Sequence, residues 1–287
     1  SEVWHGFRWG ISGAEEVFKA DKSHPIKQLA ERLPYYLKGA DEIIFTVGKN
    51  QKIEPIILDL WSNLLEKYPR SGKAPNAIKP SGLNLNEMRL IKSAYEINRM
   101  REAVQISAEA HEFLRLNIHS KNNERQLQGI IEGYFLEKGT RGPAYNTIIA
   151  SGDNACVLHY VTNEDMDIED KLILMDVGAE YRGYTADVTR TIPVNGKFNN
   201  EQKIIYDLVY KSQEEAIKEA IIGNSFNDIY LKSYDIIAKG LIDLGIINDY
   251  REARKYYPHG VSHHIGLDVH DPGSRDLMEN MVITVEP

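Results

Sequence analysis

The stretch KLILMDVGAEYRGYTADVTRTIPV, residues 171–194, places two acids where the chain otherwise buries apolar side chains. Residues 172–175 read as the middle of a buried strand, and Asp176 follows at once. Asp187 lies inside a second strand-like run. If residues 180–183 form the turn of a hairpin, Asp176 and Asp187 lie directly opposite one another, with Cβ atoms roughly 4.5–5.5 Å apart. Two ionised carboxylates in such an apolar setting repel strongly unless a proton or a cation lies between them.

Two interpretations of this acid pair are open. In the first, one aspartate merely ends its strand and the other faces solvent. In the second, both carboxylates share a metal ion, and two ions about 3.5–4 Å apart would suit the pair. The second interpretation predicts that further ligands lie elsewhere in the chain.

Candidate ligands follow in two later segments. Residues 257–271, YPHGVSHHIGLDVHD, contain four of the nine histidines of the chain. If this segment is one unbroken strand, His264 and His270 lie on one face and His263 on the other. Residues 281–287, MVITVEP, form a second short apolar run that ends in an acid, Glu286. Such a set of carboxylates with one imidazole suits Mn²⁺, Co²⁺ or Zn²⁺.

One more histidine precedes the acid pair. Residues 145–160, YNTIIASGDNACVLHY, include two strand-like runs, and the second of these carries His159. Two roles are open for this side chain: a contact near the substrate or the ligands, or a purely structural one.

The order of predicted elements favours an α+β domain built from two similar halves. A capping box at Ser93 and Glu96 predicts the start of one helix, and a second helix ends at Gly139. Strands follow, up to residue 194. The same order then begins again, with a helix capped by Asn199 and Gln202, a helix over residues 226–244, and strand-like segments up to the last residue.

A separate region precedes this domain. Residues 40–50 read as a strand followed by a turn, residues 53–73 as a helix, and residues 74–84, APNAIKPSGLN, as a linker. This change of pattern predicts a domain boundary near residue 88.

Composition excludes several classes of protein. The chain has 287 residues, of which 42% are hydrophobic, with one cysteine and a formal net charge of −8. The single cysteine rules out an internal disulfide framework and fits a reducing cytoplasm. The negative charge argues against nucleic acid as a partner, and no run approaches the roughly 18 apolar residues of a membrane span. We expect a cytoplasmic protein that acts on neither nucleic acid nor a membrane.

The four motifs YNTIIASGDNACVLHY, LMDVGAEYRGYTADVTRT, HGVSHHIGLDVHD and MVITVEP together resemble those of aminopeptidase P, the proline-specific aminopeptidases of the pita-bread metallopeptidases. The resemblance covers the chain from about residue 81 onward and, more weakly, the residues before it. It implies that residues 1–80 are part of a smaller α/β domain and that residues 81–287 are the catalytic domain. It implies the pita-bread fold and a dinuclear manganese centre, with Co²⁺ or Zn²⁺ as alternatives. The ligands implied by the resemblance are Asp176, Asp187, His263 and Glu286. Histidines that face the substrate in the family match His159, His259 and His270, whereas His264 matches no functional position.

The resemblance also implies a reaction. A hydroxide that bridges the two metal ions attacks the bond before proline, because metal coordination lowers the pKa of water. Glu286 carries the proton to the proline nitrogen, and His259 and His270 stabilise the developing charge. The expected partners are peptides with proline at the second position and further copies of the chain, as a dimer or a tetramer. The family has a fifth ligand, a second glutamate, which residues 1–287 do not include, so the C-terminal end of the catalytic domain is expected to be missing.

Other functions on this fold stay open as alternatives. A prolidase cleaves Xaa-Pro dipeptides, but the HGxSH form of the histidine segment favours aminopeptidase P over the HGxGH form of prolidases. The N-terminal region disfavours methionine aminopeptidase, and the acid pair disfavours a metal-free hydrolase of the creatinase type. The remaining alternative is an inactive copy of the fold that acts as a binding module.

Overall fold

The computed structural model describes residues 2–119, 123–273 and 276–287, and it divides the chain into two compact units, Ser1–Leu85 and Asn86–Pro287. The mixture of helices and sheets confirms the predicted α+β class. The predicted domain boundary after residue 80 and the partial character of the first domain stay predictions. Within the described ranges, every helix is too short or too polar to cross a lipid bilayer.

The first unit is small and carries one pair of parallel strands, β1 and β2. Its elements are α1 (Glu2–His5), α2 (Gly10–Glu16), η1 (Ile26–Gln28), α3 (Leu29–Leu37), β1 (Glu42–Ile44), α4 (Glu54–Ser71) and β2 (Ala77–Lys79), and α5 (Gly82–Leu90) begins at its end. Strand β2 lies inside the segment predicted as a linker, so that prediction is wrong for these residues. The reason is long-range: the amide of Asn76 donates to the carbonyl of Asp41, and that of Phe45 donates to Lys79, pairings that local composition does not reveal.

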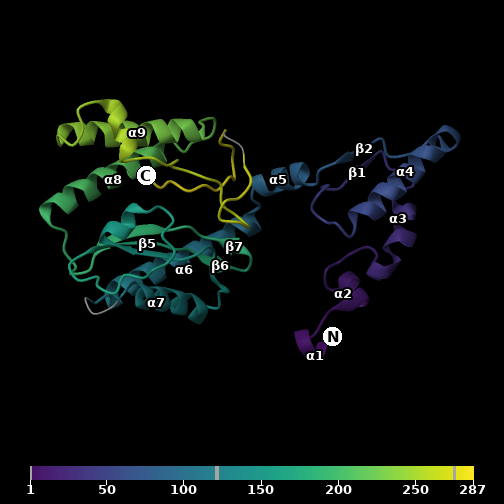
Figure 1. The fold of residues 1–287 in the computed structure, drawn as a ribbon, viewed down its shortest axis with the longest axis horizontal. Helices are drawn as coiled ribbons and strands as arrows, with labels where there is room; N and C mark the ends of the chain where they lie inside the picture. Colours follow the sequence, from purple (N-terminus) through teal and green to yellow (C-terminus); the bar gives the residue numbers. More distant parts are fainter. Residues whose placement is uncertain (1, 120–122, 274–275) are drawn as a thin grey trace. The chain divides into compact units, whose positions relative to one another are not determined.

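The second unit repeats an order of two helices and then strands or extended segments. Its elements are α6 (Ala94–Asn117), α7 (Glu124–Glu137), β3 (Gly142–Pro143), β4 (Ile148–Ser151), η2 (Gly152–Cys156), β5 (Leu172–Asp176), β6 (Ala179–Tyr181), β7 (Tyr184–Thr185), β8 (Thr189–Pro193), α8 (Asn200–Lys218), α9 (Phe226–Asp243) and η3 (Tyr250–Lys255). Figure 1 shows α6 and α7 on one side of β5, and α8 and α9 on the other. The yellow C-terminal segment lies between α8–α9 and the strands.

Local capping signals set the helix starts as predicted. Ser93 caps α6 through a capping box with Glu96, and Asn199 caps α8 through one with Gln202. The same device at Asn123 opens α7. Each box supplies partners for two backbone N–H groups that the helix itself leaves unpaired.

The hairpin that carries the acid pair has a different register from the predicted one. Its two turn residues are Arg182 and Gly183, both with positive φ (52° and 89°), a turn whose twist matches that of antiparallel strands. This places Asp176 opposite Thr189, so the prediction that Asp176 pairs directly with Asp187 is wrong. Asp187 lies two residues before Thr189, just outside the ladder, in the connection between β7 and β8.

The predicted strand that carries His159 is also wrong. After β4 the chain enters the short 3₁₀ helix η2 and then an exposed loop, and His159 lies in that loop. The fully buried carboxylate of Glu124 fixes the loop by accepting four hydrogen bonds. Its donors are the backbone N–H groups of Ser151 and Asp165, the side-chain amide of Asn154 and the hydroxyl of Tyr160, at 2.7–3.0 Å.

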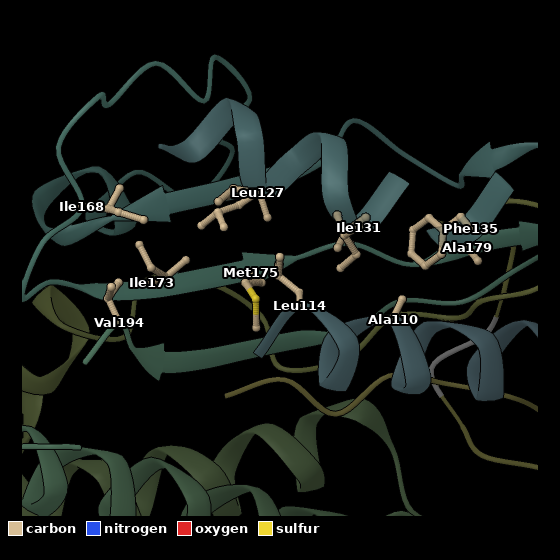
Figure 2. Packing of buried hydrophobic residues seen from close by; sticks show 12 residues of the cluster. Ala110, Leu114, Leu127, Ile131, Phe135, Ile168, Ile173, Met175, Ala179 and Val194 are labelled. Atoms are coloured by element: carbon tan, nitrogen blue, oxygen red, sulfur yellow. The ribbon is translucent and has the colours of Figure 1, made fainter. Parts of the chain in front are cut away.

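Two hydrophobic clusters form the interior of the second unit. In the first, side chains of α7 point toward β5 and meet α6 (Figure 2); its members include Leu127, Ile131, Phe135, Ile173 and Met175. In the second, α8 and α9 pack together, and Ile283 and Val285 of the C-terminal segment pack against them. Each cluster therefore anchors a segment that ends in one of the predicted acidic ligands.

The Glu124→Ala substitution should lower the free energy of unfolding by about 3 kcal/mol or more, because each buried donor left without a partner costs about 1–3 kcal/mol. Urea unfolding measures the change. Glu137→Ala, on the exposed part of the same helix, is the matched control and should change stability by less than about 0.5 kcal/mol. Equal effects of the two substitutions would contradict the assigned role of Glu124.

Candidate metal centre

Three of the four predicted ligands converge on one point. The Nε2 atom of His263 lies 3.1 Å from Oδ2 of Asp187 and 3.1 Å from Oε1 of Glu286. One ligand atom from each residue lies within 4.8 Å of the others, and all three side chains are only partly exposed. These residues come from positions far apart in the sequence, so tertiary structure alone brings them together.

Asp176 joins this group through Tyr145, a residue that the sequence analysis did not single out. The Tyr145 hydroxyl lies 2.6 Å from Oδ1 of Asp176 and 2.9 Å from Oδ1 of Asp187. Thr189, opposite Asp176 in the sheet, adds a hydrogen bond to the same carboxylate. The only sequence signal for Tyr145 was its place at the start of a strand-like motif, which says nothing about its partner.

The four predicted ligands lie on four segments. Asp176 is the last residue of β5, and Asp187 lies in the short connection between β7 and β8. His263 and Glu286 lie on two extended segments that run antiparallel. The amide of Thr284 donates to the carbonyl of His263, and the amide of Glu286 donates to that of Val261.

The predicted unbroken strand over residues 261–270 is wrong. Only His264 in this segment bridges to Ile283, after which the chain turns back so that the Asp271 amide donates to the His264 carbonyl. The turn reverses the predicted faces. The rings of His263 and His270 meet edge to face, with centroids 4.5 Å apart, instead of lying on opposite sides.

The charges of the carboxylates shift the pKa values at this point. Burial raises the pKa of Asp176, the hydrogen bond from Tyr145 opposes this, and the negative charges of Asp187 and Glu286 raise it further, to about 6. Burial lowers the pKa of His263, but its hydrogen bonds to Asp187 and Glu286 outweigh burial and raise it to about 10. Burial and the same aspartate charges raise the pKa of Tyr145 far above its usual range, so its hydroxyl stays a donor.

Hydrogen bonds behind the ligands fix their orientation. The Nδ1 atom of His263 lies 3.0 Å from the carbonyl oxygen of His264, which can only accept, so Nδ1 carries a proton and Nε2 faces the carboxylates. The hydroxyl of Thr284 accepts from the His263 amide at 3.0 Å and donates to Oε1 of Glu286 at 2.9 Å.

This arrangement fits a divalent cation. Two carboxylates lie at one imidazole, and the third, Asp176, is joined to them through Tyr145. The side chain of Asp187 has low exposure (10%), and those of His263 (23%) and Glu286 (33%) are moderately exposed. The raised pKa values of Asp176 and His263 show that the group attracts protons where a cation would relieve the repulsion. Oxygen ligands with one imidazole suit hard or borderline metal ions.

The other predicted histidines lie differently with respect to the ligands. His270 touches His263 and also lines a cavity of about 460 Å³ together with Thr185 and Arg141. His259 is half-buried against Tyr257, and His159 is exposed on its loop. No contact described for residues 2–119, 123–273 and 276–287 links either of these two side chains to the ligands. His264, to which no role was assigned, is buried against Phe226.

Comparisons with known proteins show the family to which the chain belongs. Metallopeptidase family M24 matches residues 98–287, and the N-terminal domain of aminopeptidase P matches residues 1–45. The Xaa-Pro aminopeptidase of Escherichia coli is 37% identical over 305 residues, which cover all of this chain and 68% of that protein. Intermediate cleaving peptidase 55 of Saccharomyces cerevisiae is 33% identical over all of this chain and 58% of its own length.

Solved structures confirm the pita-bread architecture. A zinc-substituted aminopeptidase P of E. coli in complex with product superimposes with a TM-score of 0.90 at 36% identity, over 99% of this chain and 68% of that one. Aminopeptidase PepP of Pseudomonas aeruginosa also gives 0.90, at 34% identity, over 99% and 67% of the two chains. The chain belongs to metallopeptidase family M24 and is a metal-dependent aminopeptidase of the aminopeptidase P type.

Proposed function

We propose that the protein removes the first residue from peptides whose second residue is proline, and that Asp176, Asp187, His263 and Glu286 hold two divalent metal ions for this reaction. The observation that carries the proposal is the convergence of Asp187 and Glu286 on Nε2 of His263, with Asp176 joined to Asp187 through the hydroxyl of Tyr145. The name Xaa-Pro aminopeptidase of the E. coli relative supports the substrate class.

The metal ions would polarise the scissile carbonyl and lower the pKa of a water molecule toward neutrality. Manganese is the proposed metal, with Co²⁺ or Zn²⁺ as alternatives, since three carboxylates and one imidazole offer mainly hard donors. The two aspartates balance the positive charge and are held by Tyr145 from behind.

The remaining groups of the site would handle protons and developing charge. Glu286, oriented by the hydroxyl of Thr284, would take the proton of the attacking water and deliver it to the leaving proline nitrogen. His270, next to His263, would donate a hydrogen bond to the developing oxyanion. His159 and His259 would contact the substrate. Three features stay predictions: the homo-oligomeric state, the cytoplasmic location, and a fifth metal ligand, which would be a second glutamate.

The metal-loaded protein should cleave Arg-Pro-Pro at the first bond and should leave Arg-Ala-Pro and N-acetylated Arg-Pro-Pro intact, because the site is proposed to hold a free amine and a proline ring. Chromatography of the released arginine measures both rates. Faster cleavage of the dipeptide Arg-Pro than of Arg-Pro-Pro would identify a prolidase instead, and equal rates on proline and alanine peptides would overturn the proposal.

The Asp187→Asn substitution should remove bound metal and lower kcat/KM by more than about 10²-fold, since even residues behind metal ligands contribute about 10–100-fold. The asparagine oxygen can still accept a hydrogen bond from Tyr145. The urea concentration at which the metal-free variant is half unfolded should therefore be close to that of the metal-free wild type. Elemental analysis and peptide assays check the result. Asp207→Asn, on the exposed pair with Lys203 in α8, should leave both quantities unchanged.

Metal affinity should rise with pH, because His263 must lose its proton before Nε2 can bind a metal ion. With its pKa at about 10 in the metal-free protein, we expect the association constant to rise roughly tenfold per pH unit between pH 6.5 and 8.5. Below about pH 6 the slope should steepen, since Asp176 then also carries a proton. Titration with Co²⁺ followed by visible absorbance measures the affinity, with His259→Ala as the control that keeps the slope. A pH-independent affinity would refute this coupling.

A further inference from the structure

We infer that the buried ion cluster of Arg89, Lys92 and Asp271 positions His270 against His263. The two cations, at the end of α5 and just before α6, would set the geometry of the loop formed by residues 264–271, which is called the catalytic loop below. The catalytic part of this inference rests on the proposed function, because it takes His270 as a group that contacts the substrate.

The cluster is almost fully withdrawn from solvent. The side chains of Lys92 and Asp271 are each 1% exposed, and the Nζ atom of Lys92 lies 3.2 Å from Oδ2 of Asp271. The guanidinium of Arg89 donates to the other oxygen of Asp271 and, at 2.7 Å, to Oδ2 of Asp268. Both cations therefore bind carboxylates on one loop, 179 and 182 residues later in the sequence.

That loop is folded tightly around the Asp271 carboxylate. Its ends are joined where the Asp271 amide donates to the His264 carbonyl at 2.9 Å, and within it the Gly266 amide donates to Asp268. A Cβ atom at Gly266 would lie only 2.5 Å from Oδ2 of Asp271 and 3.1 Å from Cε of Lys92. The backbone at Gly266 thus rests directly on the ion pair, and the position of the pair sets the path of the loop.

The two functional histidines flank this loop. His263 comes just before it, His270 is its penultimate residue, and their rings are in edge-to-face contact. The backbone and hydroxyl of Thr185 both donate to the Gly266 carbonyl, at 2.9 and 3.0 Å, which fixes the opposite side of the loop to β7. A displacement of Asp271 would therefore move the adjacent His270 relative to the metal ligand.

Stability alone is a poor reason for such a cluster. Removing two charges from water carries a desolvation penalty that their attraction often fails to recover, and apolar replacements of buried ion pairs are frequently as stable. A buried charge pair instead imposes direction and distance, since both groups must keep their partners. Because this cluster lies beside His270, we assign it the role of fixing the geometry of the loop.

A double-mutant cycle tests the inference on the full metal-loaded chain, with Lys92→Met and His270→Ala made singly and together. Lys92→Met keeps most of the apolar side chain, and we expect it to lower kcat by about 10-fold or more with unchanged metal content. In the His270→Ala background the same substitution should change kcat by less than about twofold, because the group on which it acts is absent. Equal losses in both backgrounds would overturn the positioning role.

Two further variants separate positioning from loss of stability. Arg89→Met, whose side chain is 27% exposed, should show the same dependence on His270 and replaces Lys92→Met if that variant does not fold. Leu241→Ala removes a buried side chain of α9, outside residues 264–271, and destabilises the unit, so its kcat below the unfolding temperature should equal that of the wild type. A loss of kcat in Leu241→Ala equal to that in Lys92→Met would show a general effect of destabilisation.

A measurement without turnover distinguishes failure of this inference from failure of the proposed function. In ¹H–¹⁵N spectra of the metal-free protein, the ring signals of His270, assigned with His270→Ala, should shift in Lys92→Met and stay in place in Leu241→Ala. If the wild type cleaves no Xaa-Pro peptide but these shifts occur, the loop geometry holds and the reaction is wrong. Unmoved His270 signals in Lys92→Met would overturn the inference itself.

Discussion

Repulsion among the carboxylates around His263 is the constraint on which the architecture of the second unit depends. Asp176, Asp187 and Glu286 would separate if their backbones could move, since like charges in a partly buried setting destabilise one another. Burial, together with the negative charges of Asp187 and Glu286, raises the pKa of Asp176 to about 6. Against the effect of burial, the hydrogen bonds to the same two carboxylates raise the pKa of His263 to about 10. A bound cation relieves the same repulsion, so metal binding and the local fold reinforce each other.

The fold resists the repulsion by attaching each acid to a different rigid segment. Asp176 ends a strand packed under α6 and α7, whereas Glu286 follows a segment whose Val285 packs against α8 and α9. Between them, Tyr145 ties Asp176 to Asp187 with a hydroxyl that stays protonated. The longer side chain of Glu286 loses more rotamer entropy when it is held, and the hydrogen bond from Thr284 offsets part of that cost.

Sequence predicted what local chemistry determines and missed what distant contacts determine. The helix starts at Ser93 and Asn199 followed from residues three apart, and the apolar run before Asp176 correctly predicted strand β5. The predicted hairpin register was wrong because Arg182 has a positive φ, a backbone conformation that residues other than glycine usually avoid. The prediction of a strand at His159 failed because Glu124 of α7 accepts hydrogen bonds from Tyr160 and Asp165 and so holds this segment as a loop. Tyr145 and the Lys92–Asp271 pair gave no periodic or spacing signal, since each acts only across the folded molecule.

The 179 residues between Lys92 and Asp271 have a consequence for the order of folding. Capping boxes close over three residues and can form while the rest of the chain is unfolded, whereas a contact this distant must overcome the entropy of closing a very long loop. We therefore expect the ion pair to form only after both helix pairs have met, and the loop behind His263 to take its final path at that stage. Catalytic competence would then be a late property of the folding chain, acquired after its secondary structure is complete.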